Sequence, residues 1–333
     1  MLGRSTLVLA LLVAASAQAQ AYKPPRTSFG QPDLQGIWTN VSMTKLQRPA
    51  AFKDLVASPG EAAAFEKRKG EDFDSARAPV AADAPALPHD DTIGQDATEW
   101  SDRPAGLARI GGQIRTSWIV DPMDGKLPYN TAARAAVEAA QHNDDHVFDH
   151  PEGRPFDERC LLGVGGMAGP PLLNTGSNSH VEIVQTRDHV VIVAEMNHDA
   201  RIVRLDDRRH IPAGIKPWMG DSAGWWEGDT LVVETTNFNP GERWHWNAGT
   251  YVLIAETARV TERFTRLGPE AILYRFEVED PGSYTQVWRG EMPLNAAPGP
   301  IYEYACHEGN YALTNILAGA RELERVKAER AAP

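Results

Sequence analysis

The chain has 333 residues, of which 42% are hydrophobic, and its 33 Lys and Arg against 45 Asp and Glu give a formal net charge of −12. This acidic balance argues against nucleic acid or an anionic membrane surface as a partner. No segment approaches the roughly 18 uninterrupted apolar residues of a transmembrane helix, so no membrane span is predicted.

The N-terminus has the pattern of a secretory signal peptide. Arg4 is a short basic region, an apolar run follows over residues 7–15, and residues 17–19 (AQA) match a small-residue cleavage site. We therefore interpret residues 1–19 as a signal peptide and expect a periplasmic or secreted protein. The proline-rich residues 20–32 form the expected leader to the folded part.

Residues 33–333 are predicted to form a single β-rich domain with an insertion at about 43–180, which shows little periodicity. The first strand is expected within residues 33–41. Inside the insertion, the capping pattern SPGE begins a predicted helix over residues 59–69, and an asparagine precedes an alanine-rich helix over residues 131–142.

From residue 181 onward, short alternating segments separated by turn residues predict an antiparallel meander of six or seven strands. The segments are 181–186, 190–197, 201–205, 230–238, 258–264, 272–278 and 284–292. The meander is expected to form a lipocalin-like barrel. An irregular and helical N-terminal elaboration precedes it, and a C-terminal helix at about 314–330 packs outside it.

The chain contains two cysteines, Cys160 and Cys306. In an exported protein an isolated pair is more often bridged than free, so we expect a disulfide, with two buried thiols as the alternative. The bridge would hold Tyr304 and His307 rigidly, as an active site requires. Alternatively, His307 only braces the final helix.

Polar side chains after residue 190 make this region the best candidate site. His198 extends an alternating apolar row that runs from Val190 to Met196. Burying an imidazole costs free energy unless partners are supplied, and Asp199, Arg201 and His210 could supply them.

Glu195 and Glu262 occupy apolar positions of predicted strands. Desolvation raises the pKa of such a carboxyl group unless a cation such as Arg201 keeps it ionised. Either state serves proton transfer, and a structural Glu–Arg pair between strands is the alternative.

Five of the nine tryptophans fall within residues 218–246. We expect an aromatic-lined mouth that binds the substrate, with a self-packed loop as the alternative. The residues assigned to substrate binding are Glu195, His210, Trp218, Trp225, Trp226 and Trp246.

Two further patterns are weaker. Residues 220–224 match G-x-S-x-G, but a strand–turn–helix context is missing, so we predict a turn there rather than a serine nucleophile. The histidines of residues 142–150 lack a companion metal motif, so neither a metal nor an organic cofactor is predicted. A metal held by distant ligands would use His198, Asp199, His210 and His307.

The motifs PDLQGIW, HDARIVRLD, WEGDTLVVETTNF and YEYACHEGNY resemble a family of exported, uncharacterised proteins from environmental proteobacteria and acidobacteria. The resemblance covers residues 33 to about 325 and implies kinship but no reaction. Gly36-x-Trp38 on the first strand, followed by a meander and a helix, is similar to the lipocalin-like (calycin) layout, which implies a closed barrel.

These features predict an exported, cofactor-independent enzyme that performs acid–base chemistry on a small aromatic, terpenoid or glycosidic substrate, as a lyase, isomerase or hydrolase. His198 would be the base or acid, Asp199 its orienting partner and Arg201 an anion stabiliser. Tyr304 or His307 would be the second proton-transfer group. The alternatives are a non-catalytic periplasmic binding protein for an apolar small molecule, or an envelope scaffold without a cavity.

Overall fold

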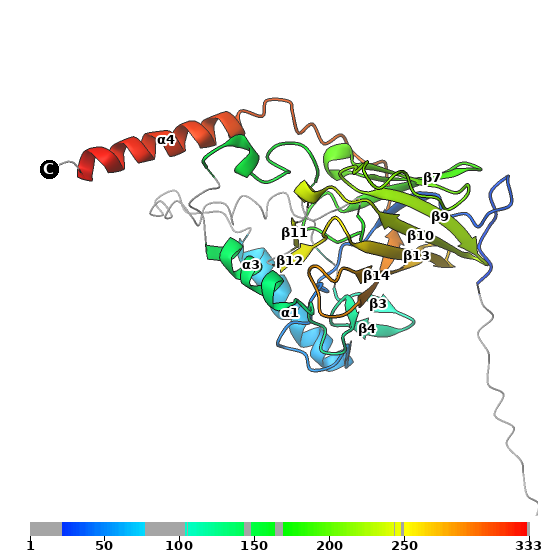
Figure 1. Cartoon of the computed structure of the whole chain (residues 1–333). Helices are drawn as coiled ribbons and strands as arrows, with labels where there is room; N and C mark the ends of the chain where they lie inside the picture. The colour runs from blue at the N-terminus through cyan, green and yellow to red at the C-terminus, as the bar shows by residue number, and fades with distance from the viewer. Residues whose placement is uncertain are drawn as a thin grey trace, which may run out of the picture.

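The computed structural model describes residues 22–76, 104, 106–142, 148–163, 169–242, 244–247 and 250–331. Within these residues, nine strands form a closed barrel (Figure 1). In order around the barrel they are β1 (Gly36–Thr39), β6 (His180–Gln185), β7 (His189–Ala194), β8 (Ala200–Arg204), β9 (Asp221–Glu227), β10 (Thr230–Thr236), β13 (Arg259–Gly268), β14 (Ala271–Glu279) and β15 (Trp288–Ala296). The expected mainly β barrel is confirmed.

The barrel closes where β1 is inserted between β6 and β15. All four residues of β1 pair with β6, and Trp38 and Thr39 also pair with Ala296 and Asn295 of β15. The first half of β15 pairs instead with the short strand β5 (Ile119–Asp121). Closure gives each strand a hydrogen-bonded neighbour on both sides, so the barrel has no exposed sheet edge there.

Strand β9 departs from the predicted antiparallel meander, because it runs parallel to β8. The GDSAG segment forms the start of this strand and not the turn that we expected. A Cβ atom on Gly224 would lie 2.7 Å from the side chain of Val203 on β8, so glycine permits this close pairing. Ser222 is buried and shares a 2.8 Å hydrogen bond with Thr235, which leaves no accessible nucleophile.

Large side chains fill the barrel interior. Phe276 and Trp288 pack edge to face with ring centroids 5.4 Å apart. A Cβ atom on Gly290 would lie 2.2 Å from the Phe276 ring, so the ring occupies the space above that glycine. The largest fully buried side chains include Trp38, Trp118, Trp288, Tyr274 and Phe264. Such filling is typical of small barrels.

The N-terminal elaboration has a small core of its own. Helix α1 (Pro59–Ala76) packs there beside a sheet of β2 (Val56–Ala57), β4 (Gln113–Arg115) and β3 (Arg109–Ile110). The predicted capping box is present, because the Ser58 backbone N–H donates to Glu61 at 2.9 Å and the Glu61 N–H donates to Ser58 Oγ at 3.3 Å. The core residues are Phe52, Ala57, Ala62, Phe65, Leu107 and Ile114.

Helix α3 follows the predicted boundaries of residues 131–142 and is capped by the Asn130 side chain. The described residues also contain three 3₁₀ turns and a two-stranded sheet. These elements are η1 (Pro151–Gly153), η3 (Met196–His198), η4 (Pro240–Glu242), β11 (Trp244–Asn247) and β12 (Thr250–Leu253).

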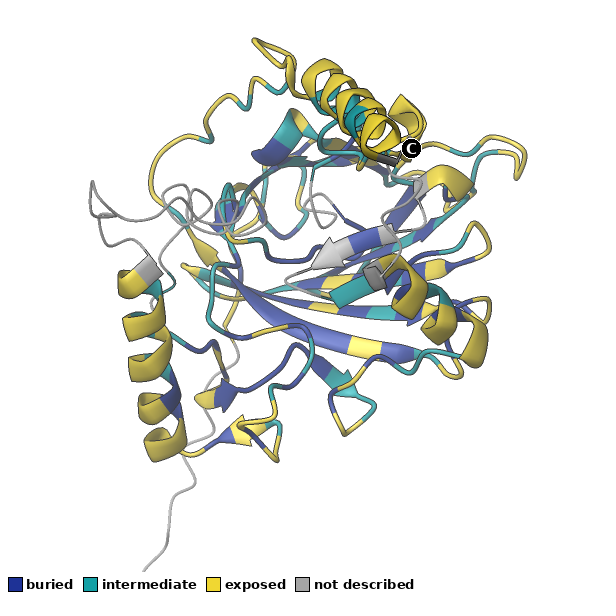
Figure 2. Cartoon of the chain, turned by 90° about the vertical axis from the view of Figure 1, so that its left-hand side faces the viewer, coloured by how far each residue is buried: buried dark blue, intermediate teal, exposed yellow. Residues whose placement is uncertain are grey.

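The C-terminal helix α4 (Ala312–Ala331) projects away from the barrel (Figure 1). Most of its residues are exposed (Figure 2). Leu323, which belongs to the predicted apolar stripe, is 63% exposed. The helix therefore lies outside the barrel as expected, but the stripe is only partly covered.

A fully buried ion pair spans the barrel interior from β8 to β13. The Arg201 guanidinium donates to both oxygens of Glu262 at 2.7 and 2.9 Å, and the two side chains are 2% and 0% exposed. The Tyr274 hydroxyl donates to the same carboxylate at 2.8 Å and accepts from the Leu172 N–H at 2.8 Å. This is the structural pairing that the sequence left as an alternative for Glu262.

Removing one member of this pair should strongly destabilise the fold. Glu262→Ala leaves the Arg201 charge buried without a counterion, and we expect the free energy of unfolding to fall by about 3–5 kcal/mol. Glu277→Ala breaks the exposed pair with Arg289 and should cost about 1 kcal/mol or less. Urea unfolding of both variants measures the difference, and equal losses would contradict the role assigned to the buried pair.

Candidate functional site

The chain turns sharply after β7 at the position where the sequence predicts a continuing strand. The strand ends at Ala194, and the Ala194 N–H donates to the Asp199 carbonyl at 2.8 Å to close the turn. Asn197 and His198 have φ angles of 60° and 54°. His198 therefore does not extend the apolar row, and its side chain is exposed.

His198 instead holds the C-terminal segment. Its Nε2 accepts a 2.9 Å hydrogen bond from the Tyr304 backbone N–H. A ring nitrogen that accepts a hydrogen bond has its lone pair occupied, so Nε2 is not available to take a proton from a substrate. The geometry gives His198 a positioning role.

Asp199 is half-buried in the same turn. Its Oδ2 accepts from the Gly163 N–H at 2.7 Å, and its Oδ1 accepts from the Asn197 side chain at 3.3 Å. Burial raises the pKa of the Asp199 carboxyl group in spite of these hydrogen bonds. A carboxyl group in this state suits a general acid.

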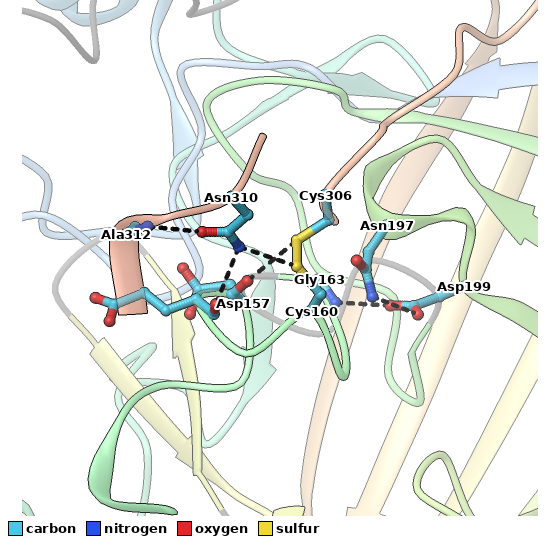
Figure 3. The surroundings of a disulfide bond; sticks show 9 residues. Asp157, Cys160, Gly163, Asn197, Asp199, Cys306, Asn310 and Ala312 are labelled. Atoms are coloured by element: carbon cyan, nitrogen blue, oxygen red, sulfur yellow. Dashed lines mark hydrogen bonds between the residues drawn. A yellow bond between two sulfur atoms is a disulfide. The ribbon is translucent and has the colours of Figure 1, made fainter. Parts of the chain in front are cut away.

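The predicted disulfide between Cys160 and Cys306 is present beside this turn (Figure 3). It joins the segment before Gly163 to the segment after Tyr304, and Asn310 reinforces the junction by donating to the Glu158 carbonyl at 3.3 Å. In Figure 3, Asp199 and Asp157 lie on opposite sides of the bridge.

Asp157 is an acidic residue that our sequence analysis did not select. Burial raises the pKa of its carboxyl group, and the pKa of Tyr304 is raised by burial and by the Asp157 charge. Asp157 lies three residues before Cys160. Because a disulfide fixes the residues near it, this position could have indicated a candidate site residue.

A histidine–carboxylate dyad lies on the other side of the turn. The Nδ1 atom of His180 is 2.9 Å from Glu195 Oε2, and Asn178 donates to Glu195 Oε1 at 3.2 Å. Glu195 is almost fully buried, whereas the His180 side chain is 29% exposed. No described residue contacts His180 Nε2 through a hydrogen bond, so this nitrogen is open to a ligand.

This arrangement matches the chemistry of a general base. A buried carboxylate on Nδ1 fixes the tautomer and orientation of the imidazole and stabilises the cation that forms when Nε2 takes a proton. Our sequence analysis missed His180, because a histidine on the polar face of a strand has no distinguishing local pattern. Its partner Glu195 follows β7 directly, and the antiparallel register of β6 and β7 places the two opposite each other, with the Glu195 N–H donating to the His180 carbonyl at 2.9 Å.

The structure places His210 in a separate network. Its Nδ1 lies 2.8 Å from Asp221 and its Nε2 lies 3.2 Å from Glu234. Arg204 also donates to Asp221, and Arg259 donates to Glu234. Both ring nitrogens are occupied, so His210 fastens the connection between β8 and β9.

The predicted tryptophans have different surroundings. Trp218 packs edge-on against Phe156 with ring centroids 5.4 Å apart. Trp225 lies under the Arg208 guanidinium at 4.4 Å, whereas Trp226 packs against the core. Because Trp225 and Trp226 are consecutive on β9, their side chains point to opposite faces. The side chain of Trp246 lies outside the described residues.

The remaining predicted residues are in two places. Arg201, two residues after Asp199, forms the buried interior pair with Glu262. His307 is exposed next to Cys306. Among the described residues, no group of three or more His, Cys, Asp and Glu side chains is arranged to hold a metal ion.

Comparison with protein-family models, with curated proteins and with solved structures finds no match. None of the described helices is long and apolar enough to cross a membrane.

Reduction of the disulfide should undock the C-terminal segment and leave the barrel intact. Residues 304–310 are held to the body by the bridge, by the hydrogen bond that the Tyr304 N–H donates to His198, and by the one that the Asn310 side chain donates to the Glu158 carbonyl. Hydrogen exchange of the Cys160→Ser/Cys306→Ser variant should lose protection there and in α4, while β13 and β14 keep theirs. Loss of protection throughout the barrel would contradict this local role.

The pH dependence of stability should reveal the Asp199 carboxyl group. The pKa of Asp199 is above the usual 3.8 in the folded state, so between these two pKa values the folded state binds more protons than the unfolded state. Stability therefore falls as the pH rises through the window. The side chain of the Asp199→Asn variant does not titrate. The free energy of unfolding of this variant, minus that of the wild type, should therefore increase as the pH rises from about 3 to about 7. Denaturant unfolding at several pH values measures this, and a difference that stays constant or shrinks would contradict the raised pKa.

Proposed function

We propose that this protein is an exported, cofactor-independent enzyme that performs acid–base chemistry on a small molecule at the turn between β7 and β8. The observation that supports it best is the His180–Glu195 dyad, in which a buried carboxylate orients an imidazole whose second nitrogen is open. The substrate is a small aromatic, terpenoid or glycosidic compound, and the reaction is a lyase, isomerase or hydrolase step.

The roles follow from the contacts. His180 is the general base and Glu195 is its orienting partner. Asp199 is the general acid, because its carboxyl group has a raised pKa and lies four residues from Glu195 in the same turn. His198 and the disulfide hold Tyr304 beside this turn. A base at the start of β6 and an acid in the turn after β7 are the two groups with opposite tasks that acid–base catalysis requires.

The disulfide supports an exported location, because such bonds persist in oxidising compartments. The signal peptide that we infer for residues 1–19 lies outside the described residues.

The test is turnover by the purified protein in an extract of small metabolites, followed by mass spectrometry. His180→Gln should lower the rate of depletion of any substrate by about 100-fold or more, the usual scale for a general base. His189→Gln is the matched control, because His189 is an exposed histidine at the start of the neighbouring strand. Both variants should unfold at the wild-type denaturant concentration.

Undiminished turnover by a folded His180→Gln variant would remove the dyad from the reaction. If the wild-type protein retains a compound without converting it, the protein is a binding protein and the enzyme proposal is wrong.

A further inference from the structure

A cavity of about 330 Å³ lies outside the barrel at its seam. Its walls come from the residues that follow β1, from the end of β15, from α1 and from the segment leading into β3. We call it the seam pocket, and its main polar and apolar walls are Asn40, Ser42, Glu66, Arg109, Pro293 and Asn295. Cavities of this size accommodate small ligands.

The seam pocket forms where two cores meet. Leu107 belongs to the N-terminal core and its neighbour Ala108 to the barrel core, and both line the cavity. Ligand sites in proteins are often found at such junctions between packed units.

Strand register connects the seam pocket to the dyad. Thr39 pairs with His180 on one side and with Asn295 on the other. Paired residues of adjacent strands point to the same face, so these three side chains form a row on the outer surface of the barrel. Two strand spacings separate His180 from Asn295, a distance of about 10 Å. One small molecule can therefore contact both.

The carboxylate in the pocket is held firmly. Glu66 Oε1 accepts from the Leu107 N–H at 2.8 Å, and a Cβ atom on residue 106 would lie 2.8 Å from the same oxygen. Gly106 therefore lets the loop approach Glu66 closely. The second oxygen of Glu66 has no hydrogen bond to a described residue, so it can accept from a ligand.

The lining is electrically balanced and rich in hydrogen-bonding groups. One carboxylate, Glu66, is offset by one guanidinium, Arg109, and the exposed amide of Asn295 adds neutral donors and an acceptor. The Ser42 hydroxyl donates to the Gly106 carbonyl, and the buried Asn40 amide donates to Met292, so both of these help to shape the pocket wall. Because the two charges balance, the lining does not favour the binding of a ligand with a net charge. Hydroxyl groups both donate and accept, so they match this mixture of partners.

We propose that the seam pocket is the substrate-binding subsite of the dyad and takes a neutral, hydroxyl-rich molecule of carbohydrate type. This inference rests on the proposed function, because it assigns the subsite to the His180 base. It selects the glycosidic class from the three substrate classes above. The small apolar surface of Pro293 and Leu107 would pack against the C–H groups of a sugar ring.

The experiment measures binding before catalysis. Calorimetric titration uses methyl β-D-glucopyranoside and its galacto and manno isomers, with phenol and glycine as probes of other chemistry. At least one glycoside should bind the full-length mature protein. Its affinity should fall about tenfold or more in Asn295→Ala and in Arg109→Ala, which each remove an exposed polar partner.

The controls separate the pocket from general surface effects. Arg187→Ala, at an exposed arginine in the β6–β7 hairpin, should leave affinity unchanged. His180→Gln should also keep the glycoside bound while turnover is lost. The absence of binding by every glycoside, binding that the two pocket variants do not weaken, or preferential binding of phenol or glycine would overturn the assignment.

The two proposals fail in different ways. If a glycoside binds in the seam pocket and no glycoside or metabolite is converted, the enzyme proposal is wrong and only a carbohydrate-binding pocket remains. If His180→Gln abolishes turnover of a substrate whose KM is unchanged in Asn295→Ala and Arg109→Ala, the dyad stands and the subsite is wrong.

Discussion

The insertion of β1 between β6 and β15 is the constraint on which the rest of the molecule depends. It closes the barrel with only two residue pairs to β15, after which the chain departs toward the N-terminal core. The departure leaves the seam pocket, and the pairing itself aligns His180, Thr39 and Asn295 on one face. The insertion of β1 thus both closes the barrel and forms the proposed substrate site.

Among the described residues, the barrel interior is stabilised by packed aromatic and aliphatic side chains and by a buried charged cluster. Arg201 and Tyr274 both donate to Glu262, so neither the guanidinium nor the carboxylate is buried without a counter-charge, which would be costly. Because Arg201 is fixed, the preceding turn is fixed as well. The buried pair thereby supports Asp199 without taking part in the chemistry that we propose for it.

The outer elements act on the turn from both sides. On one side Asn178 and Glu195 orient His180, and on the other the disulfide and His198 hold Tyr304. The first set of contacts lies within the β6–β7 hairpin, whereas the His198 contact and the disulfide join segments 106 and 146 residues apart in the sequence. Rigid support of this kind lets the His180 imidazole on β6 and the Asp199 carboxyl group on the turn each keep a defined geometry.

The sequence by itself determined the features that depend on local pattern. These are the β periodicity after residue 181, the capped helices, the burial of Glu262 and the pairing of two cysteines. The tertiary structure decided which polar groups meet. His198 left the apolar row because a turn with positive φ interrupts the strand, and the pairing register of β6 and β7 placed His180 opposite Glu195. Strand pairing and barrel closure bring distant residues together, and a single sequence carries no local signal of such contacts.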